Sequence, residues 1–507
     1  MIKSRLFLIV ALALSLALGL ALVFPAASSA KELNFGTTIA PSVIDPANAY
    51  GGWWAVRYGI GESPFKLDQS MRPVPWLATD LKRIDDKTWE LTLREGVTFQ
   101  SGRPLTGEAA KKSLERLLAQ NARAASNLAI AEIKADGQKL TLVTSAPNPT
   151  LPNYLAEPYA SMVDVEEEAR SDYFVGTGPY KIKSFKANEA VEMVPYENYW
   201  GGKPKLDLIT YTNIRDGATL SMSLQSGAID AADRLPFSMH PLFDNPGFKI
   251  ETMPSSRVFM LYFNFERPFT SIPEVREAIS LAIDKKGYCQ VLLHGAGTPA
   301  IGPFPANLPF GGDKVSGFGF DPAKASQALA KASFSDADGD GILDKDGQKL
   351  SLKLVMASSW FDIPVIAEAL QGQLREIGVE LVLEQVESVV ETLEKGDFDL
   401  SIYSIMTTPV GDPEAFLEMV GSSQGGYNFG HYKSEKVDKL LERLRVEFGE
   451  KERSDLAIQI TQAILDDAAF SFIINLTVSM ITKREVSNLG LHPTENYQIS
   501  VDTDISE

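Results

Sequence analysis

The 507-residue chain has one cysteine and four histidines, and each scarcity excludes a class of site. Cys289 alone cannot form an intrachain disulfide, a cysteine-type zinc site or an iron–sulfur cluster. It also lies too far along the chain to be a lipidated cysteine at the start of a mature protein. The histidines never stand at i,i+2 or i,i+4 spacing, so transition-metal ligation by imidazole has little support and no resident cofactor is expected.

Clustered positive charge is also lacking. The chain has 48 Lys and Arg against 66 Asp and Glu, a net charge of −18, and no basic run follows its N-terminal segment. Nucleic acids and anionic membrane surfaces require clustered cations, so neither is expected as a partner. With 44% hydrophobic and 22% charged residues, the composition is that of a soluble globular protein. The length predicts two or three packed units.

The N-terminal segment has the three parts of a secretory signal peptide. Lys3 and Arg5 precede an apolar run over residues 6–24, and small residues follow Pro25 up to Ala30. This order predicts a signal peptide over residues 1–30, cleaved after Ala30. An uncleaved membrane anchor stays open as an alternative, because the run is long enough to cross a bilayer. We expect an exported, unlipidated protein, free in the periplasm of a bacterium with two membranes.

Short strands alternating with amphipathic helices predict an α/β protein. Residues 89–93 alternate apolar and polar side chains, which is typical of a half-buried strand. Thr106 is placed to cap a helix over 107–119, and Gly378 to end a helix that begins at residue 363. Residues 257–265 are apolar on both alternations, which indicates a strand buried on both faces or passing between two lobes.

Two glycine-containing motifs invite an enzymatic interpretation. Residues 421–425 read Gly-Ser-Ser-Gln-Gly, the pattern of a nucleophile elbow, which requires a strand before the serine and a helix after it. Here residues 413–420 are predicted to be helical, so the context is inverted. Residues 294–297 lack the lysine and hydroxyl of a phosphate loop and predict an ordinary turn. An exported hydrolase or metal-dependent enzyme therefore stays only as an alternative.

An acidic turn resembles the start of a calcium loop. Asp336, Asp338 and Asp340 occupy positions 1, 3 and 5, Asp344 occupies position 9, and a glycine stands at position 6. Position 12 is Gly347, so the bidentate glutamate of such loops is missing. The segment is a calcium-site candidate, with a solvated acidic turn as the alternative.

Aromatic residues gather beside a cation near the predicted mature N-terminus. Two glycines separate Tyr50 from Trp53 and Trp54, and Arg57 follows. This arrangement suits a loop that presents flat apolar faces and a charge to a ligand. The alternative is that part of the group belongs to the core, because Val56 and Ile60 continue a helical apolar stripe.

Six motifs in order resemble the large solute-binding proteins of ABC importers for peptides and nickel, over nearly all of residues 33–505. The motifs are Val74-Pro75-Trp76-Leu77-Ala78 with Lys87-Thr88-Trp89, Val175-Gly176-Thr177-Gly178-Pro179-Tyr180, Glu197-Asn198-Tyr199-Trp200, Gln225-Ser226-Gly227-Ala228-Ile229-Asp230, Val275-Arg276-Glu277-Ala278-Ile279 and Gly411-Asp412-Pro413.

The resemblance implies a two-lobed α/β fold of the periplasmic-binding-protein type (type II), with a hinge. The first lobe would comprise residues 31–258, with an inserted subdomain at about 50–171. The second lobe would comprise residues 259–483, and residues 484–507 would return to the first lobe. Residues 257–265 and 470–482 would then be the two crossings.

The resemblance implies a monomeric receptor that captures a small solute and delivers it to ABC permease subunits driven by a cytoplasmic ATPase. In nickel-binding relatives a metal chelate is held by arginines and aromatics. Arg123 falls on one such arginine, Tyr159 near a second, and Met406 with Thr407 near a tryptophan of the second lobe. The peptide binders' acid corresponds here to Pro409, which favours a nickel or other metal chelate over a short peptide.

Overall fold

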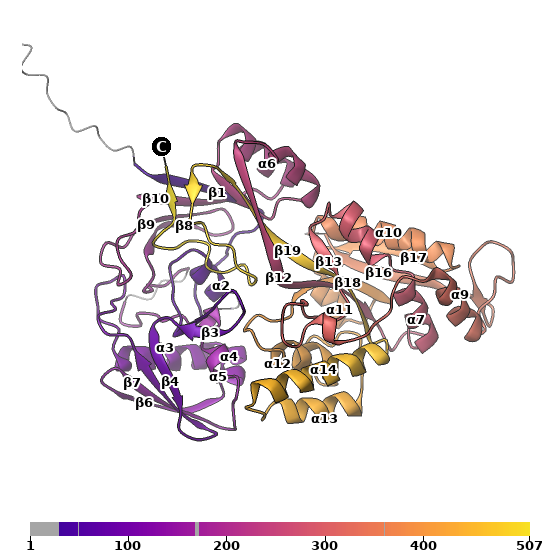
Figure 1. Cartoon of the computed structure of the whole chain (residues 1–507), viewed down its shortest axis with the longest axis horizontal. Helices are drawn as coiled ribbons and strands as arrows, with labels where there is room; N and C mark the ends of the chain where they lie inside the picture. Colours follow the sequence, from indigo (N-terminus) through magenta and orange to yellow (C-terminus); the bar gives the residue numbers. More distant parts are fainter. Residues whose placement is uncertain (1–29, 49, 168–171, 359, 507) are drawn as a thin grey trace, which may run out of the picture.

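The computed structural model describes residues 30–48, 50–167, 172–358 and 360–506 (Figure 1). The predicted signal peptide, apart from Ala30, lies outside the described residues. Within the described part of the chain, no helix is long and apolar enough to cross a membrane. The structure is mixed α/β, as predicted, and its strands fall into two groups that define two lobes.

The first lobe is built on a mixed sheet. β1 (Glu32–Thr37) pairs in parallel with β10 (Leu208–Asn213) and β11 (Ala231–Asp233). β9 (Ala190–Pro195) and β8 (Tyr180–Lys186) continue the sheet with antiparallel pairing. Alternate residues of β1 and β10 are fully buried, and they form the core of this lobe with aromatic residues of the preceding and following segments.

A subdomain between β1 and β8 carries a second sheet, in the order β4-β5-β7-β6. Its strands are β4 (Ala78–Arg83), β5 (Thr88–Leu93), β6 (Ile130–Asp136) and β7 (Lys139–Thr144). β5 confirms the predicted strand, and its apolar residues are buried in alternation. Helix α3 (Gly107–Gln120) begins as predicted, because Thr106 Oγ1 accepts a hydrogen bond from the Ala109 amide at 3.2 Å.

The second lobe contains a parallel three-stranded unit. β16 (Ser351–Ala357) lies between β17 (Glu380–Val386) and β18 (Leu400–Met406). Helix α10 (Asp362–Glu376) connects β16 to β17, and the predicted glycine, Gly378, follows it with φ +81°. The other helices of this lobe include α7 (Pro273–Leu281), α9 (Pro322–Lys331), α13 (Glu435–Leu444) and α14 (Glu450–Asp466).

Two long antiparallel strands join the two groups of strands (Figure 1). β12 (Phe248–Phe263) pairs with β18 of the second lobe, and β19 (Phe470–Lys483) pairs with β11 of the first. The predicted crossing over residues 470–482 lies within β19, and the one over residues 257–265 overlaps β12, which ends at Phe263. Their pairing register shifts between Pro254 and Val258, so the ladder is interrupted where the chain passes from one lobe to the other.

The C-terminal segment packs on the first lobe. β20 (Val486–Ser487) pairs with β21 (Asp504–Ile505), and the Ile499 amide donates to the Arg57 carbonyl at 3.1 Å. The lobes also touch directly, because Asn153 Nδ2 of the subdomain donates to the Val410 carbonyl of the second lobe at 2.9 Å. The described conformation therefore has its lobes in contact.

Candidate functional site

Three tyrosines from both lobes meet between them. Tyr50, 69% exposed, precedes the first helix of the first lobe, while Tyr403 lies in β18 and Tyr427 follows helix η5 (Leu417–Gly421) of the second. Burial and the neighbouring Tyr50 raise the pKa of Tyr403 to about 12, and the same two causes raise the pKa of Tyr427. Tyr50 of the first lobe therefore lies close to Tyr403 and Tyr427 of the second, and we call the space between the lobes at these residues the cleft.

Arg123 lies beside these tyrosines and is ion-paired. It belongs to α4 (Ala122–Leu128), and its Nη2 lies 2.5 Å from Oε1 of Glu157. Its guanidinium carbon is 5.1 Å from the centre of the Tyr159 ring. Glu157 is only 9% exposed, and burial raises its pKa although Arg123 opposes that shift. Tyr159 is 2% exposed, so it supports Arg123 from beneath and does not line the open cleft.

The predicted glycine loop is instead a short helix, α2 (Gly51–Arg57). A Cβ on Gly51 would lie 2.1 Å from the Asp45 carbonyl oxygen, and one on Gly52 would lie 2.5 Å from the Pro158 carbonyl oxygen. The two glycines therefore allow close backbone packing, which the expectation of an open loop did not include.

The aromatic residues of α2 turn into the first lobe. Trp54 is 8% exposed, and Trp53 donates its ring N–H to the Thr494 carbonyl at 3.2 Å. Arg57 is 1% exposed and packs against both rings, at 4.4 and 5.9 Å from their centres. Of the four predicted residues, Tyr50 is the one that borders the cleft. Trp53, Trp54 and Arg57 support the site from inside.

Arg57 belongs to a buried cluster of charges beside the crossing strands. Its Nη2 contacts the Asp233 carboxylate, and its Nη1 donates to the Glu495 carbonyl at 2.8 Å. The Glu495 carboxylate accepts from Arg257 Nε at 2.9 Å and from Arg234 Nη1 at 3.2 Å. The sequence analysis missed Arg234, Arg257 and Glu495. No local pattern marks them, because they are brought together from three distant segments.

The predicted second-lobe residues lie at the end of β18. Met406 is partly exposed and is paired with Arg257 across the β12–β18 ladder. Thr407 is fully buried, and both its amide and its hydroxyl donate to the Ser256 carbonyl, at 2.7 and 3.0 Å. In this conformation Thr407 holds the crossing strand and is not open to the cleft.

Two of the motifs that carried the resemblance meet at one buried carboxylate, Glu62. It accepts hydrogen bonds from Thr177 Oγ1 at 2.8 Å, Tyr199 Oη at 2.7 Å and Trp200 Nε1 at 3.0 Å, and it lies next to the first lobe's core. Burial raises the pKa of Glu62 to about 7 despite these donors. Gly178 allows the close approach, since a Cβ there would lie 2.3 Å from a carbonyl oxygen. These motifs therefore build the lobe.

Asp412 is also structural. Its Oδ1 accepts from the Glu414 amide at 2.9 Å, at the start of the short helix α12 (Glu414–Phe416), whose N-cap residue is Pro413. Both of its oxygens accept from Arg453, at 3.0 and 2.7 Å, and Arg453 also donates to the Glu414 carboxylate at 2.7 Å. Arg453 is 6% exposed. The Asp-Pro motif thus anchors α14 to the loop that carries it.

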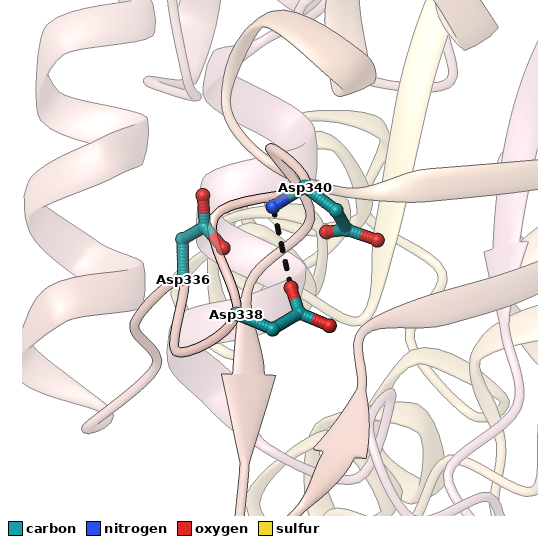
Figure 2. Close-up of side chains that lie close together, drawn as sticks. All are labelled: Asp336, Asp338 and Asp340. Carbon is teal, nitrogen blue, oxygen red and sulfur yellow. Dashed lines mark hydrogen bonds between the residues drawn. The ribbon is translucent and has the colours of Figure 1, made fainter.

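The acidic turn forms a compact, exposed loop (Figure 2). The carboxylates of Asp336, Asp338 and Asp340 lie within 4.8 Å of one another. Asp336 accepts from two glycine amides of the loop, and Asp338 accepts from the Asp340 amide at 3.2 Å. The Lys349 ammonium lies 3.0 Å from Asp338 and also contacts Asp340. Asp344 Oδ2 faces the Ala337 amide at 3.4 Å. Calcium binding here stays a prediction, in competition with Lys349.

The enzymatic motifs do not assemble into a catalytic set. Residues 421–425 begin at the last residue of helix η5, where a nucleophile elbow needs a strand, and the Ser423 amide donates to the Asp438 carboxylate. Cys289 is buried, and burial raises the pKa of its thiol to about 11. Within the described ranges, the acidic turn is the one cluster of three or more groups able to hold a metal ion.

Two lobes joined by paired strands, with a polar aromatic cleft between them, define a solute-binding protein. The model of the bacterial extracellular solute-binding proteins, family 5, matches residues 72–428. The chain belongs to this family, and the predicted resemblance is confirmed.

Relatives within the family bind different solutes. The nickel-binding protein NikA of Staphylococcus aureus is 28% identical over 487 residues, covering 94% of this chain and 95% of that protein. The probable D,D-dipeptide-binding periplasmic protein DdpA of Escherichia coli is 27% identical over 516 residues, covering 96% and 97%. Sequence similarity alone therefore leaves the solute open.

Solved structures confirm the fold. NikA of S. aureus in complex with Ni(L-His)2 matches with a TM-score of 0.82 at 27% identity, over 94% of this chain and all of that chain. NikA of Brucella suis in complex with Fe(III)-EDTA matches with a TM-score of 0.85 at 22% identity, again over 94% and 100%. The predicted two-lobed α/β fold is thereby confirmed.

Proposed function

We propose that this chain is the extracytoplasmic receptor of an ABC importer and captures its solute by closure of the two lobes. It makes and breaks no bond. Binding energy shifts the population from an open to a closed arrangement. The closed receptor then delivers the solute to membrane permease subunits coupled to a cytoplasmic ATPase. Family membership supports this role, as does the tyrosine cluster, to which both lobes contribute.

A metal chelate, with nickel as the first candidate metal, is the solute that the cleft favours. The observation that carries this choice is the chemistry of the cleft wall: tyrosine hydroxyls and Arg123, with no cluster of histidine and cysteine ligands among the described residues. Such a wall suits a metal that arrives already coordinated by an organic acid. Arginine pairs with the carboxylates of that acid, and the aromatic faces pack against its carbon atoms.

A short peptide is the second candidate, and Glu157 is the observation that favours it. This buried carboxylate is paired with Arg123 in the described conformation, and a peptide amino group would have to replace the Arg123 guanidinium on it. Asp412 is not available for that role, because Arg453 occupies both of its oxygens. Pro409 stands where peptide binders carry their acid, so a peptide would have to be held differently here.

Calorimetric titration of the ligand-free mature protein separates these candidates. The probes are nickel alone, nickel with L-histidine, nickel with citrate, and a set of short peptides. A chelate receptor binds nickel with histidine or citrate and does not bind nickel alone. Tight binding of nickel alone contradicts the chelate proposal, and binding of peptides only would make the peptide candidate the function. Binding of none of the probes contradicts both.

The proposed location is the periplasm, after removal of residues 1–30. Among the described residues, those next to the expected mature terminus support this proposal, because β1 starts at Glu32 and the Lys31 amide donates to the Asp207 carboxylate at 2.9 Å. After cleavage the same nitrogen would be an α-ammonium, which is a stronger partner for that carboxylate. Lys31 Nζ also pairs with Asp504 at 2.7 Å, so this residue is held on both sides.

A further inference from the structure

The buried cluster beside the crossing strands has more positive than negative charge. Arg57, Arg234 and Arg257 face two carboxylates, Asp233 and Glu495. Arginine stays protonated in proteins, so the cluster has a surplus of one positive charge. Burial, with Arg257 nearby, lowers the pKa of Arg234 from its ordinary value. An unneutralised charge with little access to water is costly unless an anion joins it.

Two of the three guanidinium groups have donors to spare. Among the described residues, Arg234 donates one side-chain hydrogen bond, through Nη1 to Glu495, and Arg257 donates one, through Nε to the same carboxylate. A guanidinium carries five N–H donors. Both side chains border a cavity of about 80 Å³ and are 21% and 16% exposed. This volume accommodates several waters, and therefore a carboxylate group.

The second lobe supplies a cover for these arginines. The Trp360 ring lies 5.1 Å from the guanidinium carbon of Arg234 and 5.4 Å from that of Arg257. Arg234 follows β11 of the first lobe, Arg257 lies on the crossing strand β12, and Trp360 precedes α10 of the second lobe. A Cβ on Gly217 of the first lobe would lie 3.9 Å from the Phe361 ring, so this segment bridges the lobes.

We propose that Arg234 and Arg257 form a carboxylate-binding subsite at the hinge end of the cleft, completed by Trp360 of the second lobe when the lobes close. The inference rests on the proposed receptor function and names a chemical group of its solute. A carboxylate fits because one negative charge balances the cluster and two neighbouring guanidinium groups offer it parallel donors. The ring of Trp360 excludes water from the pair and strengthens it.

The subsite lies on the same pair of strands as Tyr403, which is three residues from Met406, the register partner of Arg257. Arg257 is near enough to Tyr403 to oppose the rise in that tyrosine's pKa. This arrangement selects solutes with an anionic group at one end, which both amino-acid chelates and peptides possess.

Asp362 is the internal group that would compete with a solute carboxylate to be the counter-ion of the arginine cluster. It lines the cavity from the second lobe, and no ion pair joins it to Arg234 or Arg257 in the described structure. Burial raises the pKa of Asp362 to about 6, so it is mostly ionised at neutral pH. If Asp362 were the cluster's counter-ion, its removal would weaken the site. If a solute carboxylate is the counter-ion, removal of Asp362 relieves repulsion instead.

The test uses the mature protein with sodium citrate, nickel with L-histidine, and the dipeptide Ala-Ala as probes. The thermal unfolding midpoint and intrinsic tryptophan fluorescence are followed as each probe is added. The variants are Arg234→Gln, Arg257→Gln, Asp362→Asn and Trp360→Leu. Arg215→Gln is the matched control, because Arg215 is exposed on the first lobe. Circular dichroism checks that each variant is folded.

At least one probe should stabilise the wild type and change its fluorescence. Each arginine variant should lose about tenfold in affinity, the effect of removing one charged partner. Arg215→Gln should be unchanged and Asp362→Asn unchanged or tighter. Trp360→Leu should lose the fluorescence change. If an arginine variant does not fold, this variant still tests the subsite.

Equal affinity of wild type, both arginine variants and Trp360→Leu would overturn the subsite and leave the receptor function standing. The subsite would also be overturned if Asp362→Asn weakened probe binding as much as the arginine variants do. No response to any probe would contradict the receptor proposal and the subsite together.

Discussion

Arg123 and Glu157 form an ion pair on the cleft wall, with 2.5 Å between Nη2 and Oε1, and their exposures differ sharply. The arginine side chain is 53% exposed, whereas the glutamate is 9% exposed. The cation therefore reaches the solute while its partner holds it from behind. A solute carboxylate that binds Arg123 must share it with Glu157, so this pair sets how strongly the cleft attracts anions.

Substitutions on the two sides of this pair should change binding in opposite directions. Arg123→Ala should weaken binding of nickel with L-histidine by about 2 kcal/mol, because it removes the cation. Glu157→Gln should strengthen the same binding by about 1 kcal/mol, because Arg123 no longer has a competing anion. Calorimetric titration measures both, with Arg215→Ala as the exposed control. Changes of the same sign in both variants would exclude this role for the pair.

Glu62 should make the stability of the protein depend on pH. Its pKa is raised to about 7 in the folded state, so the folded protein holds a proton that the unfolded chain has released. Its contribution is therefore fully present below about pH 4.5 and is lost as pH rises through about 7, by on the order of 3 kcal/mol.

The measurement for Glu62 is urea unfolding at several pH values. The difference in unfolding free energy between wild type and Glu62→Gln should shift in favour of the variant as pH rises through this window. Glu189→Gln, which changes an exposed carboxylate of the same lobe, should show no such trend. Parallel curves for wild type and Glu62→Gln would show that the proton is not held at Glu62.

Arg453 should be a strong contributor to the stability of the second lobe. Arg453→Met leaves two neighbouring carboxylates, Asp412 and Glu414, buried without their cation. Breaking a buried pair in this way costs about 3–5 kcal/mol. Chemical unfolding measures the loss, and Arg443→Met on the exposed face of α13 should stay within about 0.5 kcal/mol of wild type. A loss for Arg453→Met as small as the control's would refute the structural role given to the Asp-Pro motif.

Lobe closure should be visible in solution. The crossing strands β12 and β19 are interrupted between Pro254 and Val258, and contacts such as Asn153 to Val410 close the opposite side. Small-angle scattering should give a smaller radius of gyration with the bound solute than without it. The same radius at saturating solute, as established by calorimetry on the same sample, would contradict capture by closure.

Export should yield a mature chain that begins Lys31-Glu32. N-terminal sequencing of the protein released by osmotic shock from its natural host checks this expectation. The new α-ammonium should pair with Asp207, so Asp207→Asn should lower the stability of the cleaved protein by less than about 1 kcal/mol. Recovery of the uncleaved chain in the membrane fraction would contradict the periplasmic assignment.

The sequence by itself predicted the elements whose causes are local. Thr106 caps α3 through the Ala109 amide, three residues further on, as the sequence pattern indicates. The apolar alternation of residues 89–93 became β5. Such signals can be recognised in the sequence because the interacting groups are separated by only two to four residues. The motifs of the resemblance supplied the family, and with it the two-lobed fold.

Tertiary structure alone decided which side chains border the cleft. Trp54 and Arg57 are residue types that are typical of a ligand site. They nevertheless point inward, because Gly51 and Gly52 pack closely against neighbouring backbone. The charges of Arg234, Arg257 and Glu495 are far apart in sequence, and no periodicity connects them. Ion pairs depend on distance in space and on loss of water, and both are set only when the lobes and the C-terminal segment pack together.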